Sequence, residues 1–149
     1  MKIVLASDHA GFKLKEEIKK FLGERGIEFE DCGSYNEERT DYVDWGEKAI
    51  NKIINGESQR GILICGTGLG MEIVANKFYG IRATPCYDLY TAKMARQHND
   101  SNVLTLGGRI TDKDLAKKIV EVWLETEFQG NRHKVRLDKI RKIEEKNFK

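Results

Sequence analysis

The stretch Gly61-Ile62-Leu63-Ile64-Cys65-Gly66-Thr67-Gly68-Leu69-Gly70 decides how the rest of the chain is organised. Its apolar half predicts a buried strand that ends on a cysteine and runs directly into a glycine-rich turn. The amphipathic residues 71–78 follow and predict a helix. This arrangement puts peptide N–H groups and the positive end of a helix beside the Cys65 sulfur, where both would stabilise a thiolate. A cysteine at a strand end is more often a small buried hydrophobe, so both interpretations stay open at this point.

The remaining segments repeat the alternation of strand and helix. Further strands are predicted at residues 2–7, 27–31, 81–84 and 103–106, with a helix after each of them and a last helix from about 132 to 146. Residues 27–31 alternate between apolar and acidic side chains, which is typical of a strand at the edge of a sheet. The alternation predicts an α/β fold with one five-stranded parallel sheet covered by helices on both faces. Because no linker or internal repeat is visible, residues 1–149 are expected to form one domain.

The composition excludes several classes of protein. The chain has 40% hydrophobic and 34% charged residues, and no apolar run approaches the length of a membrane span. The apolar run at the N-terminus is too short for a signal peptide. The three cysteines, Cys32, Cys65 and Cys86, show neither a paired nor a zinc-binding spacing. Reduced thiols and a cytoplasmic location are therefore expected.

The charge is unevenly distributed along the chain. Residues 132–149 contain eight Lys and Arg against three Asp and Glu, although the whole chain has a formal net charge of only +2. This basic end suits an anionic ligand or, less specifically, nucleic acid. The apolar stripe of the last helix (Val135, Leu137, Ile140 and Ile143) is thin. Such a helix either packs onto a second subunit or lies solvated on its own subunit, and the pattern favours neither.

Polar side chains follow three of the predicted strands. Asp8 and His9 come directly after the first strand, Cys65 ends the third, and Arg109 follows the fifth. In an open parallel sheet, ligands bind beyond the carboxyl ends of the strands. We therefore expect these four side chains to lie around one site at that edge.

Other candidate residues lie elsewhere on the predicted fold. His98 and Asn99 come just before the fifth strand, so they are expected at the opposite edge of the same sheet. They could reach the first group only across a dimer interface or by a long excursion of the chain, and this conflict favours a site shared between two chains. Arg132 and Arg136 lie four residues apart on one helix face and fit either a phosphate grip or ordinary surface charge. The histidines also have structural alternatives, since His9 could cap the next helix and His98 could bond to its own loop.

Comparison with known anion-binding motifs excludes several kinds of site. The turn reads GxGxG rather than the GxGxxG of dinucleotide-binding folds, and no Walker sequence is present. A cysteine phosphatase would carry an arginine six residues after its cysteine, where Met71 stands. A cysteine hydrolase remains open, because Asp8, His9 and His98 could supply the histidine and the carboxylate that it needs.

Seven motifs together resemble those of one family. They are Ser7-Asp8-His9-Ala10-Gly11, Glu38-Arg39-Thr40-Asp41-Tyr42, residues 61–70, Ala75-Asn76-Lys77, Gly80-Ile81-Arg82-Ala83, Arg96-Gln97-His98-Asn99-Asp100 and Gly130-Asn131-Arg132-His133. In this order they resemble the sugar-phosphate isomerases that include the type B ribose-5-phosphate isomerases and the galactose-6-phosphate isomerase subunits. The resemblance implies a Rossmann-like three-layer sandwich without a metal or other cofactor. It also implies a homodimer or a pair of dimers with the site at the interface, and neither a nucleic-acid nor a membrane partner.

The activity implied by the resemblance is that of an aldose–ketose isomerase in the pentose phosphate pathway. Ribose 5-phosphate and ribulose 5-phosphate would interconvert through an enediol(ate). Cys65 corresponds to the base that moves a proton between C1 and C2, and His98 to the acid/base that opens the sugar ring. Some relatives use a glutamate at the position of Met71 instead, which makes Cys65 the candidate base here and leaves Glu72 without that role. The substrate-binding residues carried over are Asp8, His9, Gly66, Thr67, Gly68, Leu69, Gly70 (the last five as an anion hole), Asn99, Arg109, Arg132 and Arg136.

Three other functions stay open from the sequence. The chain could isomerise a six-carbon sugar phosphate such as allose or galactose 6-phosphate, because pocket depth cannot be read from the sequence. It could be an anion-sensing or nucleic-acid-binding module, although its basic helix lacks interleaved aromatic residues. It could also be a non-catalytic subunit of a hetero-oligomer, against which the presence of both Cys65 and His98 argues.

Overall fold

The computed structural model describes residues 1–148, in which five strands alternate with six helices. In chain order the elements are β1 (Lys2–Ser7), α1 (Phe12–Glu24), β2 (Glu28–Asp31), α2 (Tyr42–Ile54), β3 (Arg60–Cys65), α3 (Leu69–Ala75), β4 (Ala83–Pro85), α4 (Leu89–Gln97), β5 (Val103–Gly107), α5 (Lys113–Glu125) and α6 (Arg132–Asn147). The predicted strand–helix alternation is confirmed. Among these described residues, no helix combines the length and the apolar character needed to cross a membrane.

The strands form one parallel sheet in the order β2-β1-β3-β5-β4. The half-polar strand β2 lies at one edge, as its alternating sequence predicts. From β1 the chain moves outward to β2, whereas from β3 it crosses to the other side of the sheet and reaches β4. The strand order therefore reverses between β1 and β3, and ligands of open parallel sheets bind beyond the carboxyl ends of such strands.

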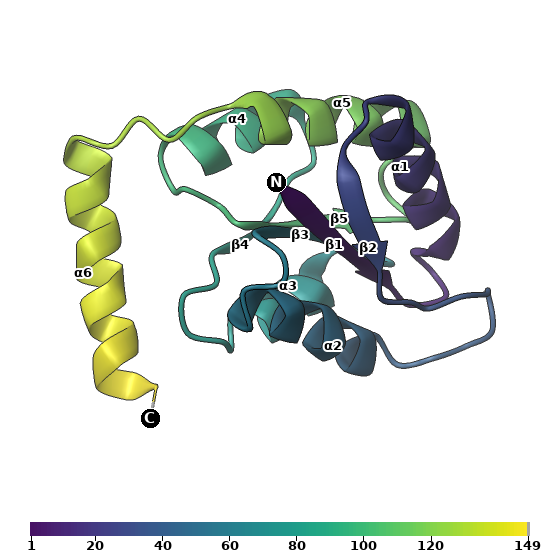
Figure 1. The fold of residues 1–149 in the computed structure, drawn as a ribbon, viewed down its shortest axis with the longest axis horizontal. Helices are drawn as coiled ribbons and strands as arrows, with labels where there is room; N and C mark the ends of the chain where they lie inside the picture. Colours follow the sequence, from purple (N-terminus) through teal and green to yellow (C-terminus); the bar gives the residue numbers. More distant parts are fainter. Residues whose placement is uncertain (149) are drawn as a thin grey trace.

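Helices cover both faces of the sheet and create two apolar cores (Figure 1). On one face α1, α4 and α5 pack against the strands, with Ile18 and Trp123 fully buried. On the other face α2 and α3 enclose Ile50 and Met71. The two cores confirm the three-layer α/β sandwich.

Helix α6 differs from the other five helices. In Figure 1 it stands apart from the sheet and its two helical layers, and His133 is its one buried residue within the described part of the chain. Val135, Ile140 and Ile143 are each about half exposed or more, at 55%, 45% and 62%. The thin apolar stripe expected from the sequence is thus left largely uncovered by the helix's own chain.

The glycine-rich turn is shorter than its sequence indicates. Helix α3 begins at Leu69, so the turn itself consists of Gly66, Thr67 and Gly68. Gly68 has a φ of +85°, a left-handed conformation that L side chains rarely adopt. A Cβ at this position would also lie 3.1 Å from the backbone of Leu106. The sharp turn at Gly68 lets α3 start immediately after β3.

Candidate active site

Three loops meet beyond the carboxyl ends of β1, β3 and β5. The Gly108 N–H donates to the Cys65 carbonyl at 2.8 Å, and the Arg109 N–H donates to the Gly66 carbonyl at 3.0 Å. From the β1 side, the Asp8 N–H donates to the Ile64 carbonyl at 3.3 Å. The four polar residues predicted to share this edge, Asp8, His9, Cys65 and Arg109, are therefore carried by loops that bond directly to one another.

Cys65, the candidate base, ends β3 at this edge. Its side chain is buried, and its Sγ accepts a hydrogen bond from the Gly68 N–H at 3.2 Å. That N–H stands at the start of α3, where the helix dipole is positive. The structure therefore places a peptide donor and a helix N-terminus beside the sulfur, at the position where the sequence pattern predicts them.

The candidate anion hole has fewer free donors than its five residues offer. The Gly68 N–H is directed to the Cys65 sulfur, and the Leu69 N–H donates to the Thr67 hydroxyl at 3.2 Å. Both donors hold the turn in shape instead of facing a ligand. Of the five candidates, Gly66, Thr67 and Gly70 do not donate to these two side chains, so their N–H groups remain the candidates for binding an anion.

Two tyrosines outside the quoted stretch support this turn. The Tyr87 hydroxyl donates to the Thr67 carbonyl at 2.9 Å from the loop before α4. The Tyr42 ring lies against Gly70, where an added Cβ would be 2.6 Å from the ring carbon Cζ. The role of Tyr87 was not predicted, because a single tyrosine in a loop shows no sequence pattern that indicates its contact with the turn.

Asp8 and His9 are fixed by backbone groups. Asp8 is 6% exposed, and its Oδ1 accepts the Gly11 N–H at 3.0 Å. His9 accepts the Thr40 N–H on Nδ1 at 3.2 Å, so the neutral ring carries its proton on Nε2 and can donate from that atom. The Trp45 indole in turn donates to the Thr40 hydroxyl at 2.9 Å. The alternative in which His9 caps α1 is wrong, since the N-cap is Gly11 and no side chain caps the helix.

The loop that carries Thr40 is anchored by a buried lysine. The Lys15 ammonium contacts Asp31 Oδ1 at 2.6 Å and the Ser34 carbonyl at 2.5 Å, and its side chain is fully buried. Burial opposes the ionisation of Asp31, but hydrogen bonds from Lys15, Lys19 and the Gly33 N–H outweigh it and lower the pKa of this carboxyl. Sequence reasoning missed Lys15, because a lysine is normally expected to face water, although this position shares the buried face of α1 with Ile18 and Leu22.

His98 and Asn99 lie at the amino ends of the parallel strands, opposite to the carboxyl ends where Cys65 lies, as predicted. His98 caps the end of α4, and the loop after it reaches the start of β3, where the Gly61 N–H donates to the Asn102 carbonyl at 3.0 Å. Along β3, Cys65 is four residues further on, which corresponds to roughly 13 Å of strand. Within one chain, His98 is therefore remote from the Cys65 sulfur.

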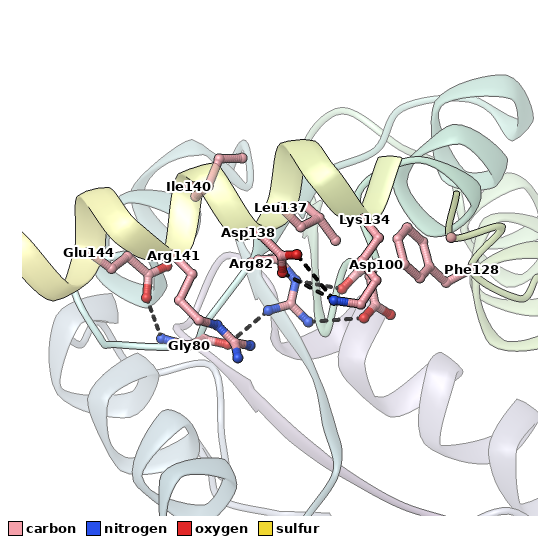
Figure 2. A pocket seen from close by; sticks show the side chains of 11 residues that line it. Gly80, Arg82, Asp100, Phe128, Lys134, Leu137, Asp138, Ile140, Arg141 and Glu144 are labelled. Carbon is pink, nitrogen blue, oxygen red and sulfur yellow. Dashed lines mark hydrogen bonds and ion pairs between the residues drawn. The ribbon is translucent and has the colours of Figure 1, made fainter. Parts of the chain in front are cut away.

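The candidate phosphate residues Arg132 and Arg136 lie on the exposed part of α6, also away from Cys65. Figure 2 shows how this helix is held at its far end, where Glu144 accepts the Gly80 N–H at 2.8 Å. A cavity of about 490 Å³ separates α6 from the Arg82–Asp100 ion pair. The cavity contains none of the predicted site residues.

Comparison with known proteins identifies the family. The model of the Ribose/Galactose Isomerase family matches residues 3–140. Ribose-5-phosphate isomerase B of Escherichia coli is 48% identical over 145 residues, which cover 97% of each chain.

Solved structures agree with this match. The Clostridium thermocellum ribose-5-phosphate isomerase B has a TM-score of 0.96 and 52% identity, with 98% of this chain and 99% of the other covered. The Mycoplasma genitalium ribose-5-phosphate isomerase B with bound ribulose-5-phosphate has a TM-score of 0.93 and 38% identity, with 98% and 97% covered. The chain that carries Cys65 at this sheet edge therefore belongs to the ribose/galactose isomerase family.

Proposed function

We propose that this chain interconverts ribose 5-phosphate and ribulose 5-phosphate. The observation that carries the proposal is the buried Cys65 sulfur, which receives the Gly68 N–H at 3.2 Å at the edge where the strand order reverses. A sulfur held in this way is suited to take a proton from carbon. The similarity to enzymes named ribose-5-phosphate isomerase B supports the choice of substrate.

The proton transfer follows from the groups around Cys65. The thiolate removes the C2 proton of the open-chain aldose, and an enediolate forms. The proton is then returned to C1, while O2 loses its hydroxyl proton and O1 gains one, so that the ketose results. The peptide N–H groups of Gly66, Thr67 and Gly70 are the proposed donors to the developing oxyanion, and one such donor lowers the barrier by roughly 3 kcal/mol.

Substrate binding is assigned to the remaining residues of the shared site. Asp8 and His9 contact the sugar from the β1 loop, and Arg109 lies beside Gly66, where it can face an anionic group. From the partner chain, His98 opens the ring, Asn99 contacts the sugar, and Arg132 with Arg136 binds the phosphate. Histidine suits ring opening because it can give and take a proton near neutral pH.

A homodimer is part of the proposal. His98 and Asn99 lie at the edge opposite Cys65, and the apolar stripe of α6 is exposed, so a second chain would complete the site and cover the helix. Three buried, unpaired thiols support the cytoplasmic location expected from the sequence.

Two single variants test the catalytic assignment and the shared site together. Cys65→Ala is expected to abolish proton exchange at C2 of ribose 5-phosphate while binding survives, and His98→Asn to abolish turnover. Mixed and re-equilibrated, the two inactive proteins should regain up to about a quarter of the wild-type activity, because half of the dimers are mixed and each carries one intact site. An active Cys65→Ala protein would refute the base assignment, and a mixture without activity would refute the proposal that the site is shared between two chains.

Galactose 6-phosphate and allose 6-phosphate, assayed with the wild-type protein in parallel with ribose 5-phosphate, test the six-carbon alternative.

A further inference from the structure

The ring of His98 is stacked on a second histidine that the proposed reaction does not use. The ring centroids of His98 and His133 lie 4.0 Å apart, and the planes differ by 12°. His133 belongs to the first turn of α6, whereas His98 caps the end of α4. The two helices are tied beside the stack, because the Gln129 N–H donates to the Gln97 carbonyl at 3.1 Å.

His133 is unusual for a residue of α6. It is 5% exposed, whereas Arg132, Lys134 and Arg136 around it are exposed. Its Nε2 is buried without a hydrogen-bond partner in the described part of the chain. An unpartnered polar atom in a buried position costs free energy, so the ring is retained here for something other than its hydrogen bonds.

The chemistry of the stack favours a passive His133 and a working His98. Burial and the neighbouring charges of His98, Arg132 and Arg136 lower the pKa of His133, which keeps the ring neutral at pH 7. A neutral imidazole can lie flat against His98 without repelling it when His98 is protonated. His98 is only partly buried, so its ring edge can reach a substrate while its face is covered.

We propose that His133 is a positioning residue that fixes the ring plane of His98 for opening of the sugar ring. This inference rests on the proposed function, in which His98 is the ring-opening acid/base. A stacked partner at 4.0 Å restricts rotation of the His98 side chain, for which no hydrogen bond to a neighbouring side chain is present in residues 1–148. Proton transfer depends on such orientation, since a displacement of about 1 Å can reduce a rate roughly 100-fold.

The test compares His133→Ala, which removes the stacked ring, with His133→Phe, which keeps a ring of similar size. Lys139→Ala is the matched control, because Lys139 is an exposed residue of the same helix. The first readout is the ring NMR spectrum of the histidines, of which the chain has only three. His133→Ala should remove the ring-current displacement of the His98 signals, and the other two variants should retain it.

The second readout separates ring opening from proton transfer at carbon. Ribulose 5-phosphate cannot close a five-membered ring, because its C5 oxygen is esterified, so exchange of its C1 proton with D2O requires no ring opening. At saturating substrate, His133→Ala should lower turnover of ribose 5-phosphate about 10- to 100-fold and leave C1 exchange close to the wild-type rate. His133→Phe and Lys139→Ala should retain both reactions.

Three results would overturn the inference. They are unchanged turnover of ribose 5-phosphate in His133→Ala, equal loss of turnover and C1 exchange in that variant, and a His133→Phe protein as impaired as His133→Ala. If the wild-type protein catalyses neither reaction, the proposed function fails instead. The NMR comparison then still decides whether His133 orders the His98 ring.

Discussion

Replacement of Lys15 by methionine is expected to destabilise the protein and loosen the site at the same time. Methionine fills a similar volume but cannot bind Asp31 or the Ser34 carbonyl, which the ammonium contacts at 2.6 and 2.5 Å. Asp31 would keep Lys19 at 2.8 Å and the Gly33 N–H at 2.9 Å, so this carboxylate is not stranded. The Ser34 carbonyl would lose the hydrogen bond that it now accepts from the buried Lys15 ammonium.

The magnitude follows from these two losses. A buried acceptor left without its partner costs about 1–3 kcal/mol, and loss of a charge-assisted hydrogen bond to a carboxylate that keeps other partners adds about 1 kcal/mol. We therefore expect Lys15→Met to lower the free energy of unfolding by about 2–4 kcal/mol. Because the same loop carries the Thr40 N–H that holds His9, the KM for ribose 5-phosphate should rise as well.

Urea unfolding measures the stability change, with Lys19→Met as the matched control. Lys19 binds the same carboxylate, but its side chain is 26% exposed, so its loss should cost less than about 1 kcal/mol. Equal unfolding midpoints for the two variants, or a Lys15→Met protein as stable as the wild type, would show that burial of this ammonium does not anchor the loop.

Three further predictions concern the turn, the phosphate and acid stability. Gly68→Ala should lower the free energy of unfolding by at least about 1–2 kcal/mol, because φ at this position is +85°. It should also reduce kcat, because the Gly68 N–H would move away from the Cys65 sulfur. The control is Gly23→Ala on an open stretch of α1, which should be neutral or slightly stabilising, and equal unfolding midpoints of the two variants would contradict the prediction. Arg132→Ala should mainly raise the KM for ribose 5-phosphate with a smaller effect on kcat, and steady-state kinetics with an unchanged KM would assign the phosphate elsewhere. Asp31 has a folded-state pKa below its ordinary 3.8, so it contributes stability that is present above pH 3.8 and lost as the pH falls through the folded-state value. Asp31→Asn should therefore unfold with less dependence on pH in this acid range, and acid unfolding curves parallel to the wild type would speak against the assignment.

The sequence predicts those features that depend on local patterns. The edge position of residues 28–31 follows from alternation of apolar and acidic side chains, and the convergence of Asp8, Cys65 and Arg109 follows from polar residues at strand ends. The separation of His98 from Cys65 follows from their positions along parallel strands, because His98 precedes β5 whereas Cys65 ends β3. All three depend on the order of residues within a few positions.

Features that depend on the path of a loop are not predictable in this way. Lys15 lies on α1 beside charged neighbours, and its sequence gives no sign that the loop after β2 folds over it. Tyr87 supports the turn from a distance of 20 residues along the chain. The start of α3 at Leu69 cannot be predicted from the sequence, because Leu69 stands between two glycines and either of them could end the turn.

The placement of the two tryptophans gives the molecule a pair of optical reporters. Trp123, on the inner face of α5, is fully buried; its indole donates to the Ser101 hydroxyl at 3.1 Å, and the Arg60 guanidinium lies 5.2 Å from its ring centroid. Trp45 is half-buried and bonds to Thr40, the residue that orients His9. Intrinsic fluorescence therefore contains one signal from the interior and one from the start of α2, beside the loop that holds His9. With Trp123→Phe or Trp45→Phe each signal can be followed alone, so that ligand-linked movement of the loop is distinguished from unfolding of the core.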